Sequence, residues 1–309
     1  MQQNEVCTVL QGKRSIMVIV PHEDDELLLM GGVIRHAVKM GMEADIVIAT
    51  NGDFGCRDRL VGYARLRETM AAMAMLGVPE RNLCIMGYAD TGMPKADSFL
   101  THLYEAKDGD KIYPSLCSAT TYGLEEKPEY HMQRYGVHGD YCRNTFKQDL
   151  KEIILEREPE IIFTTAESDT HGDHSALYRF VCEVLDEVKQ VELERNITEQ
   201  NETCGSTTQN GRPYAPEVYV GLAHSVAGDE NWPKRTTAFY DCPEGLNEKT
   251  DLKWNERIRI SVPEEMRLAQ GVDNLKYRAL CCYETALEPN AVEFLMSAIK
   301  DEEIFWRMR

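Results

Sequence analysis

The stretch Ser15-Ile16-Met17-Val18-Ile19-Val20-Pro21-His22-Glu23-Asp24-Asp25-Glu26 decides the fold of this chain. It begins as an apolar, β-branched run, the pattern of a strand that is buried on both faces. Pro21 ends the run, and a histidine and four acidic residues follow it. Leu27-Leu28-Leu29-Met30 then predicts the start of a buried helix. A strand, a charged corner and a helix form the first half of a βαβ unit, in which ligands bind at the carboxyl end of the strand.

Further apolar runs continue this alternation of strands and helices. We expect strands at 44–50, 83–86, 161–165 and 217–222, with another at 237–241. We expect helices at 27–40, 61–76, 144–157 and 175–189, two helical pieces at 263–270 and 272–282, and a closing helix at 289–308. Parallel strands joined by helices predict an α/β fold, with a Rossmann-like, mostly parallel sheet and helices on both faces.

Two segments depart from this regular pattern. Residues 95–145 have mixed polarity, no clear period and many tyrosines, so we predict an ordered insertion that forms a lid over the site. The block 191–213 is polar and poor in aromatic residues, which predicts an exposed loop. Residues 1–309 are otherwise expected to form a single domain.

The composition disfavours several classes of protein. The net charge is −18, from 34 basic and 52 acidic residues, and no basic cluster stands out. A protein that grips nucleic acid or an anionic membrane needs clustered Lys and Arg, so we expect neither partner. No stretch approaches the roughly 20 apolar residues that span a bilayer. The 10 cysteines form no C-x-x-C pair, and no apolar run of signal-peptide length opens the sequence, which together predict a cytoplasmic location.

A second charged corner, His171-Gly172-Asp173-His174, follows the strand expected at 161–165. Taken alone, each corner is also explained by a helix cap with nearby surface histidines, because acidic residues favour helix N-termini. Together, after two buried strands, the corners favour a metal site. A catalytic zinc ion needs three protein ligands and an open position. His22, Asp25 and His174 would supply two imidazoles and one carboxylate.

Three further residues of the corners suit hydrolysis. Asp24 is next to a ligand and could take a proton from a metal-activated water, because zinc lowers the pKa of that water to about 7. His171 is left to face the oxyanion or the leaving group, and Asp173 could orient His171. Glu23 and Glu26 are expected to be bystanders, Glu23 as a solvated residue and Glu26 as a first-turn acid.

These motifs make the sequence resemble the PIG-L/LmbE-like zinc-dependent N-acetylglucosaminyl deacetylase family. The family signature is A-H-P-D-D-E after the first strand and H-x-D-H after a later one, and both corners match it. Further family patterns are matched by Thr50-Asn51-Gly52-Asp53, by Arg65-Leu66-Arg67-Glu68, and by Lys276 with Ala279-Leu280. The chain departs from the signature at three places: Pro21 replaces an alanine, Glu23 a proline, and Thr285-Ala286 the usual Ser-Gln.

The resemblance implies a hydrolase that removes the N-acetyl group from an N-acetylglucosamine-type sugar or sugar conjugate. It assigns zinc, or another divalent metal such as Fe²⁺, to His22, Asp25 and His174. It makes Asp24 the general base and His171, held by Asp173, the electrostatic partner or general acid.

The expected partner is a small-molecule amino sugar. Arg65 and Tyr141 are the residues expected to contact this substrate, although an intrahelical ion pair with Glu68 explains Arg65 equally well. A homo-oligomer is compatible with the sequence.

Two other functions stay open at this level. A non-catalytic module could keep the fold and the metal but bind a sugar or a partner without turnover. A nucleotide-binding α/β protein is disfavoured, because no G-x-G-x-x-G motif follows the first strand.

Overall fold

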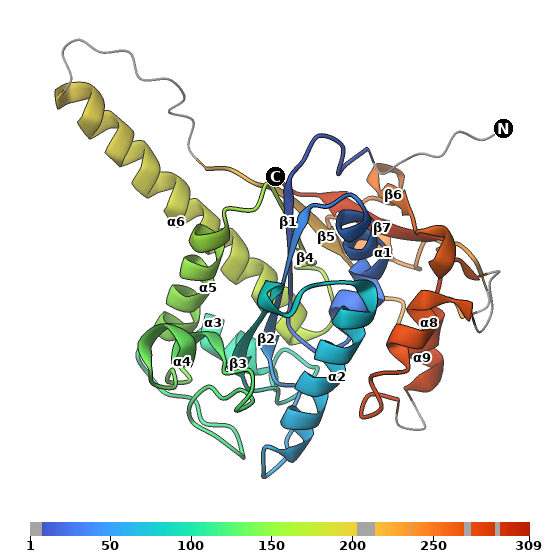
Figure 1. Ribbon diagram of the computed structural model, residues 1–309, viewed down its shortest axis with the longest axis horizontal. Helices are drawn as coiled ribbons and strands as arrows, with labels where there is room; N and C mark the ends of the chain where they lie inside the picture. Colours follow the sequence, from blue (N-terminus) through green and yellow to red (C-terminus); the bar gives the residue numbers. More distant parts are fainter. Residues whose placement is uncertain (1–7, 203–213, 236, 269–272, 288–290) are drawn as a thin grey trace.

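The computed structural model describes residues 8–202, 214–235, 237–268, 273–287 and 291–309. Its centre is a seven-stranded sheet with the order β3-β2-β1-β4-β5-β7-β6 (Figure 1). The strands are β1 (Ser15–Val20), β2 (Glu43–Thr50), β3 (Leu83–Tyr88), β4 (Ile161–Thr165), β5 (Glu217–Gly221), β6 (Ile258–Ser261) and β7 (Glu302–Arg307). The first five strands are parallel, whereas β7 runs antiparallel to β5 and β6 antiparallel to β7. The predicted α/β class with a mostly parallel sheet is confirmed.

Helices cover both faces of the sheet (Figure 1). One face carries α1 (Asp25–Lys39), α2 (Leu60–Leu76), α8 (Leu275–Leu280) and α9 (Val292–Ser297). The other face carries α3 (Phe99–Tyr104), α4 (Tyr130–Tyr135), α5 (Arg143–Arg157) and α6 (Gly172–Glu202). The short helix α7 (Leu246–Lys249) and the 3-10 turns η1 (Glu80–Asn82), η2 (Trp254–Glu256) and η3 (Glu264–Met266) complete the described elements.

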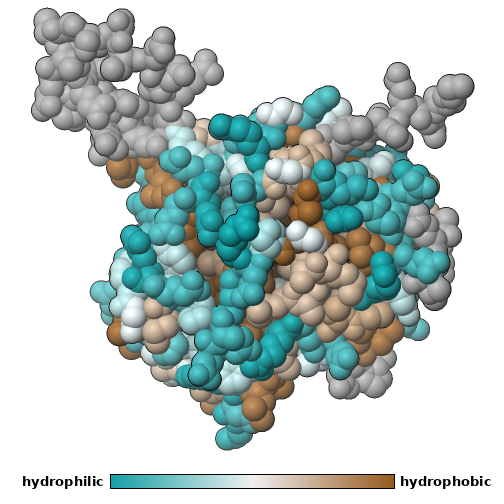
Figure 2. All heavy atoms as spheres, in the orientation of Figure 1, coloured by the Kyte–Doolittle hydropathy of each residue, from teal (hydrophilic) through white to brown (hydrophobic). Residues whose placement is uncertain are grey.

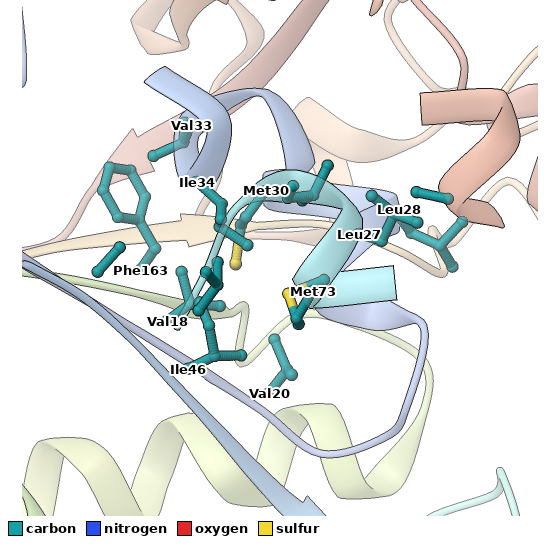
Figure 3. Packing of buried hydrophobic residues seen from close by; sticks show 14 of the residues in the cluster. Val18, Val20, Leu27, Leu28, Met30, Val33, Ile34, Ile46, Met73 and Phe163 are labelled. Atoms are coloured by element: carbon teal, nitrogen blue, oxygen red, sulfur yellow. The ribbon is translucent and has the colours of Figure 1, made fainter. Parts of the chain in front are cut away.

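Strand β1 shows why both faces are covered. Ile16, Val18 and Val20 belong to the apolar core under α1 and α2, and Met17 and Ile19 belong to the core under α5 and α6. All five side chains are fully buried. Figure 3 shows the first of these cores, where side chains of β1, α1 and α2 meet. Burial of each large apolar side chain contributes about 1.5–3 kcal/mol, so an uncovered face would be costly.

The strand order reverses between β1 and β4. From β1 the chain moves outward to β2 and β3, and from β4 it moves outward on the opposite side to β5. β1 and β4 themselves pair in parallel, with Ile16 opposite Ile161. Such a switch point leaves a crevice at the carboxyl ends of the two strands, where ligands bind in open α/β sheets. The two charged corners follow these two strands.

Helix α6 is longer than the sequence pattern predicted. It begins at Gly172 and ends at Glu202, and its outer part projects from the body (Figure 1). The loop expected at 191–213 is therefore wrong for residues 191–202, and residues 203–213 lie outside the described residues. Residues 191–202 lack aromatic residues, yet seven of them are Glu, Leu, Arg or Gln, which have good helix propensity.

The closing helix expected at 289–308 is also wrong. Among the described residues 291–308, only Val292–Ser297 is helical, and Glu302–Arg307 forms β7. Its aromatic and β-branched residues favour a strand once a partner is present, and β5 supplies one, with Val220 opposite Trp306. The strand expected at 237–241 does not form. Of the helical pieces expected at 263–270 and 272–282, the described residues contain η3 and α8, and residues 269–272 lie outside the described residues.

Residues 95–145 form an ordered segment that contains α3 and α4. Phe99, Tyr130 and Tyr141 of this segment belong to the core under α5 and α6, which is why the segment is ordered. Ser98 and the Leu100 backbone contact the second charged corner. The segment thus supports the site from one side, and its closure over the site as a lid stays a prediction.

The surface seen in Figure 2 is largely hydrophilic, with apolar side chains interspersed. Within the described ranges, no helix has the length and apolar character that a membrane span requires.

Candidate metal centre and active site

The two charged corners meet at the switch point between β1 and β4. Asp25 Oδ2 lies 3.2 Å from His22 Nδ1 and 3.2 Å from His174 Nε2, and the two nitrogen atoms are 3.3 Å apart. All three side chains are buried. Ligand atoms at about 2.0–2.1 Å from a tetrahedral zinc ion are separated by about 3.3 Å, so these three atoms fit one ion. Two imidazoles and a carboxylate also suit Fe²⁺.

Carboxylates orient both imidazoles. Asp173 Oδ2 lies 3.2 Å from His22 Nε2, and Asp169 Oδ2 lies 3.2 Å from His174 Nδ1. A proton on each of these outer nitrogens leaves the lone pairs of His22 Nδ1 and His174 Nε2 for a metal. The role expected for Asp173 is corrected here, because its carboxylate faces His22 and not His171.

The centre favours positive charge. Burial by itself lowers the pKa of His22, but the surrounding carboxylates, led by Asp90, hold that pKa well above its ordinary value. Burial likewise opposes the charging of His174, yet its carboxylate partners, led by Asp25, raise its pKa to about 10. Burial would raise the pKa of Asp25, but the two imidazoles hold it well below its usual range. A divalent cation would satisfy the same charge preference.

Two other groups of potential ligands share His22. Among the residues that the structure describes, these are His22, His171 and His174, and His22, Asp90 and Asp173, with ligand atoms within 4.8 Å of one another. The shorter separations of 3.2–3.3 Å favour the set that contains Asp25.

His171 lies beside the three favoured ligands. Its ring centroid is 4.6 Å from that of His22 and 4.8 Å from that of His174. The backbone N–H of Asp173 donates to His171 Nδ1 at 3.2 Å, so the proton of the neutral ring is on Nε2. Burial and the neighbouring imidazoles lower the pKa of His171, which keeps the ring neutral. His171 can therefore donate a hydrogen bond through Nε2.

Asp24 occupies the corner between β1 and α1. Its backbone has φ of 114°, and its side chain is 15% exposed. Burial raises the pKa of Asp24 to about 6, although Arg65, with Nη2 3.5 Å from Asp24 Oδ2, opposes the increase. A carboxyl group with a pKa close to neutral is suited to accept a proton at neutral pH.

Arg65 binds backbone atoms of the corner. Its Nη2 donates to the Glu23 carbonyl at 2.6 Å, and its Nη1 donates to the Gly52 carbonyl at 3.2 Å. Glu68 instead accepts hydrogen bonds from the backbone N–H and hydroxyl of Thr285. The alternative explanation of Arg65 by an ion pair with Glu68 is therefore wrong, and contact between Arg65 and a substrate stays a prediction.

Three other expectations do not fit the positions found. Tyr141 is fully buried, stacks on Tyr88 and donates to the Gly87 carbonyl at 3.2 Å, so it offers a substrate no exposed surface here. Glu23 is fully buried and not solvated, and Glu26, although it lies in the first turn of α1 as expected, is also fully buried and is no bystander, since it accepts hydrogen bonds from the Asp24 N–H and the Tyr283 hydroxyl. Burial raises the pKa of each of these glutamates to about 8.

Asp169, Asp90 and His224 belong to the site but were not assigned from the sequence. Asp90 Oδ2 lies 4.0 Å from His22 Nε2, and the ring centroid of His224 lies 5.7 Å from that of His171. His224 Nδ1 is 2.9 Å from Asp229 Oδ1. The available signal was position, since each residue follows a strand of the parallel sheet and those strand ends share one edge.

A pocket of about 630 Å³ adjoins the centre. Asp90 lies at the metal centre, with Oδ2 4.0 Å from His22 Nε2, and the next residue, Thr91, lines the pocket. Other lining residues include Phe54, Met93, Asp97, Phe99 and Tyr113. The pocket thus combines apolar and polar walls within the size range of small-molecule sites.

Comparison with known proteins places these observations in a family. The PIG-L model, described as GlcNAc-PI de-N-acetylase, matches residues 17–185 and so includes both corners. A search of curated proteins found no match.

Solved structures share the fold at low sequence identity. N,N'-diacetylchitobiose deacetylase from Pyrococcus horikoshii is 15% identical with a TM-score of 0.54, covering 99% of this chain and 87% of that chain. A40926 pseudoaglycone deacetylase is 14% identical with a TM-score of 0.52, covering 96% and 97%. A conserved protein from Thermus thermophilus is 14% identical with a TM-score of 0.50, covering 94% and 93%. The family model matches more than half of the 309 residues of this chain, including both charged corners, and the chain therefore belongs to the PIG-L family.

Proposed function

We propose that this protein is a zinc-dependent hydrolase that removes the N-acetyl group from an N-acetylglucosamine-type sugar or sugar conjugate. One observation carries the proposal: His22 Nδ1, Asp25 Oδ2 and His174 Nε2 form a triangle with edges of 3.2–3.3 Å, and Asp24 immediately precedes the ligand Asp25. Membership of a family described as a de-N-acetylase supports this reaction.

Each residue of the centre has a separate role in the proposed reaction. Zinc, when bound by His22, Asp25 and His174, would supply the Lewis acidity that activates water and polarises the acetyl carbonyl. Asp24 accepts a proton from the attacking water and returns it to the departing nitrogen. His171 donates its Nε2 proton in a hydrogen bond to the developing oxyanion. The water oxygen bonds to the carbonyl carbon, the C–N bond breaks, and acetate and a free amine leave.

The pocket supports a sugar as the substrate. Asp90 precedes Thr91 of the pocket wall, and its buried Oδ1 accepts no hydrogen bond from the described part of the chain. Phe54 and Tyr113 line the pocket and offer apolar surface, and aromatic rings pack well on the faces of sugar rings. Two of the structural neighbours are named as deacetylases, one of N,N'-diacetylchitobiose and one of the A40926 pseudoaglycone.

The test is a panel of N-acetylglucosamine conjugates, monosaccharides and chitooligosaccharides, assayed for acetate release with zinc-loaded protein. We expect turnover of at least one member. Asp24→Asn should lower kcat by about 10²–10⁴ without loss of zinc, because it removes the general base and leaves the ligands in place. His174→Ala should lose zinc. Asp251→Asn, at an exposed site, is the control and should match the wild type.

Two outcomes would contradict the proposal. Full activity in Asp24→Asn would refute the general base. Bound zinc without hydrolysis of any panel member would favour a non-catalytic module that binds metal and a sugar or a partner.

A further inference from the structure

The backbone of Asp24 is strained. Its φ of 114° lies in a region that residues with a side chain rarely adopt, at a cost on the order of 1–3 kcal/mol. The residue nevertheless caps the N-terminus of α1, because its carbonyl accepts the Leu28 N–H at 2.8 Å. A conformation of this kind persists only when surrounding groups hold it. The groups that hold Asp24 can be identified from the hydrogen bonds of the Glu23–Asp24 peptide.

Arg65 holds the carbonyl side of this peptide. Its Nη2 donates to the Glu23 carbonyl at 2.6 Å, and its Nη1 anchors the guanidinium on the Gly52 carbonyl at 3.2 Å. A charged donor makes a shorter and stronger hydrogen bond than a neutral one. Gly52 leaves room for this approach, because a Cβ atom there would lie 2.6 Å from the guanidinium carbon.

Glu26 and Tyr283 hold the N–H side. The Asp24 N–H donates to Glu26 Oε2 at 3.0 Å, and the Tyr283 hydroxyl donates to the other carboxylate oxygen, Glu26 Oε1. Both side chains are fully buried. The tyrosine therefore fixes the Glu26 carboxyl group that in turn fixes the peptide N–H.

A further pair of hydrogen bonds joins α2, which carries Arg65, to the segment that carries Tyr283. Glu68, on α2 with Arg65, accepts the Thr285 N–H at 3.0 Å and the Thr285 hydroxyl at 2.6 Å. Thr285 follows Tyr283 by two residues. The helix that supplies the carbonyl contact is thus joined to the segment that supplies the N–H contact.

We propose that Arg65, Glu26 and Tyr283 are positioning residues that clamp the Glu23–Asp24 peptide and so aim the Asp24 carboxylate. Glu68 and Thr285 keep the two halves of this clamp together. The clamp explains why Glu26 is buried and why the guanidinium of Arg65 is directed at backbone carbonyls. Its catalytic consequence rests on the proposed function, in which Asp24 is the general base.

Tyr283→Phe tests the clamp with little change in packing. We expect kcat to fall about ten- to a hundredfold, because small misplacements of a catalytic group have effects of this size. KM and bound zinc should stay at wild-type values, which a general loss of structure would not allow. Tyr130→Phe is the matched control, since its hydroxyl donates to Glu152 and Glu156 on α5. The control should retain the wild-type kcat.

The hydrogen bonds between Thr285 and Glu68 supply a second pair of variants. Thr285→Ser keeps the hydroxyl and should retain the wild-type kcat, whereas Thr285→Val removes it and should lower kcat in the same direction as Tyr283→Phe. Equal kcat in Tyr283→Phe, Thr285→Val and the wild type would overturn the clamp. A parallel loss of kcat, zinc and thermal stability in these variants would also overturn it, because the residues would then be structural only.

Hydrogen–deuterium exchange separates the clamp from the proposed function, since it needs no substrate. The Asp24 amide should exchange slowly in the wild type and in Tyr130→Phe, and faster in Tyr283→Phe. If the wild type hydrolyses no panel member but this difference is found, the deacetylase function fails and the clamp stands. If the exchange rates are equal, the clamp is wrong whatever the activity.

Discussion

Asp24 and Asp25 are neighbours in sequence, yet their surroundings give them different chemistry. Asp25 faces two imidazoles, which hold its pKa well below the ordinary range and leave it ionised for a metal. For Asp24, burial outweighs the attraction of Arg65 and of the two imidazoles and raises the pKa to about 6. The nearest cation to the Asp24 carboxylate is Arg65, with Nη2 3.5 Å from Asp24 Oδ2.

Asp169 offers a test of how carboxylates behind the ligands tune the centre. Asp169 Oδ2 lies beside His174 Nδ1 and accepts hydrogen bonds from the backbone N–H groups of Ala223 and His224. Asp169→Asn replaces this carboxylate with a neutral amide. We expect zinc affinity to fall about 10–100-fold, as is typical when such a partner is lost. Competition with a chromophoric chelator measures the Kd.

Asp186→Asn is the control for that measurement, because Asp186 pairs with Arg309 at an exposed position of α6. An unchanged Kd in Asp169→Asn would show that Asp169 does not tune His174.

Asp149 should give the protein a measurable pH dependence away from the centre. Burial raises its pKa from 3.8 to about 6, although His131 and the Tyr88 hydroxyl lower it. The folded state therefore holds this proton more tightly than the unfolded state. The resulting stabilisation is complete below pH 3.8 and is lost as the pH rises through 6.

Asp149→Asn removes this titration. The free energy of unfolding of the wild type, minus that of the variant, should fall by about 2–3 kcal/mol between acidic and neutral pH. Urea denaturation across this range measures the difference. A constant difference at all pH values would contradict the assignment.

At the scale of elements, the buried ion pair between Lys276 and Glu303 binds backbone groups in the middle of α1. Glu303 accepts the N–H groups of Gly32 and Val33 at 2.7 and 3.0 Å. Lys276 Nζ donates to the Leu28 carbonyl at 2.9 Å and lies 3.0 Å from the Glu303 carboxylate. Side chains from α8 and β7 thus bind backbone groups of the helix that begins with a metal ligand. The matched family pattern at Lys276 has a structural explanation in these contacts.

Lys276→Met should destabilise the protein strongly. It leaves the Glu303 carboxylate buried without its cation, which typically costs about 3–5 kcal/mol. Lys39→Met, on α1, removes a half-exposed pair with Glu265 and should cost less than about 1 kcal/mol. Denaturant unfolding compares the two. Similar losses in both variants would show that the buried pair has no special role.

At the scale of the whole molecule, the centre joins two parts of the fold. His22 and Asp25 come from the β1–α1 corner, whereas His174 is on α6 after β4. A metal bound to all three would link the two corners and stabilise the folded state by mass action. The same three ligands would be separated in the unfolded chain.

Zinc should therefore raise the melting temperature, and a chelator should lower it. At a zinc concentration 100 times the Kd, the stabilisation is about 2.7 kcal/mol. His174→Ala should melt at the same temperature with zinc and with chelator, because one ligand is lost. Thermal unfolding monitored by circular dichroism provides the comparison. An equal response of the variant and the wild type would mean that zinc binds elsewhere.

Local patterns determined the central architecture and the candidate ligands. The five parallel strands and the helices between them follow from apolar runs and their spacing, because burial on two faces demands such runs. His22, Asp25, His171 and His174 could be selected because strand ends of a parallel sheet share one edge. Each strand, helix and corner follows from residues close together in the sequence, and the general rule for parallel sheets brings the two corners together.

Only the tertiary structure decided which residues those groups would meet. Asp173 turns to His22, Tyr141 enters the core, and the chain end joins the sheet as β7. Tyr283 reaches Glu26 across 257 positions of the chain. Contacts over such separations leave no period or spacing in the sequence, since they depend on how whole elements pack. The sequence thus determined the chemical groups at the corner after β1, and packing decided how they are held.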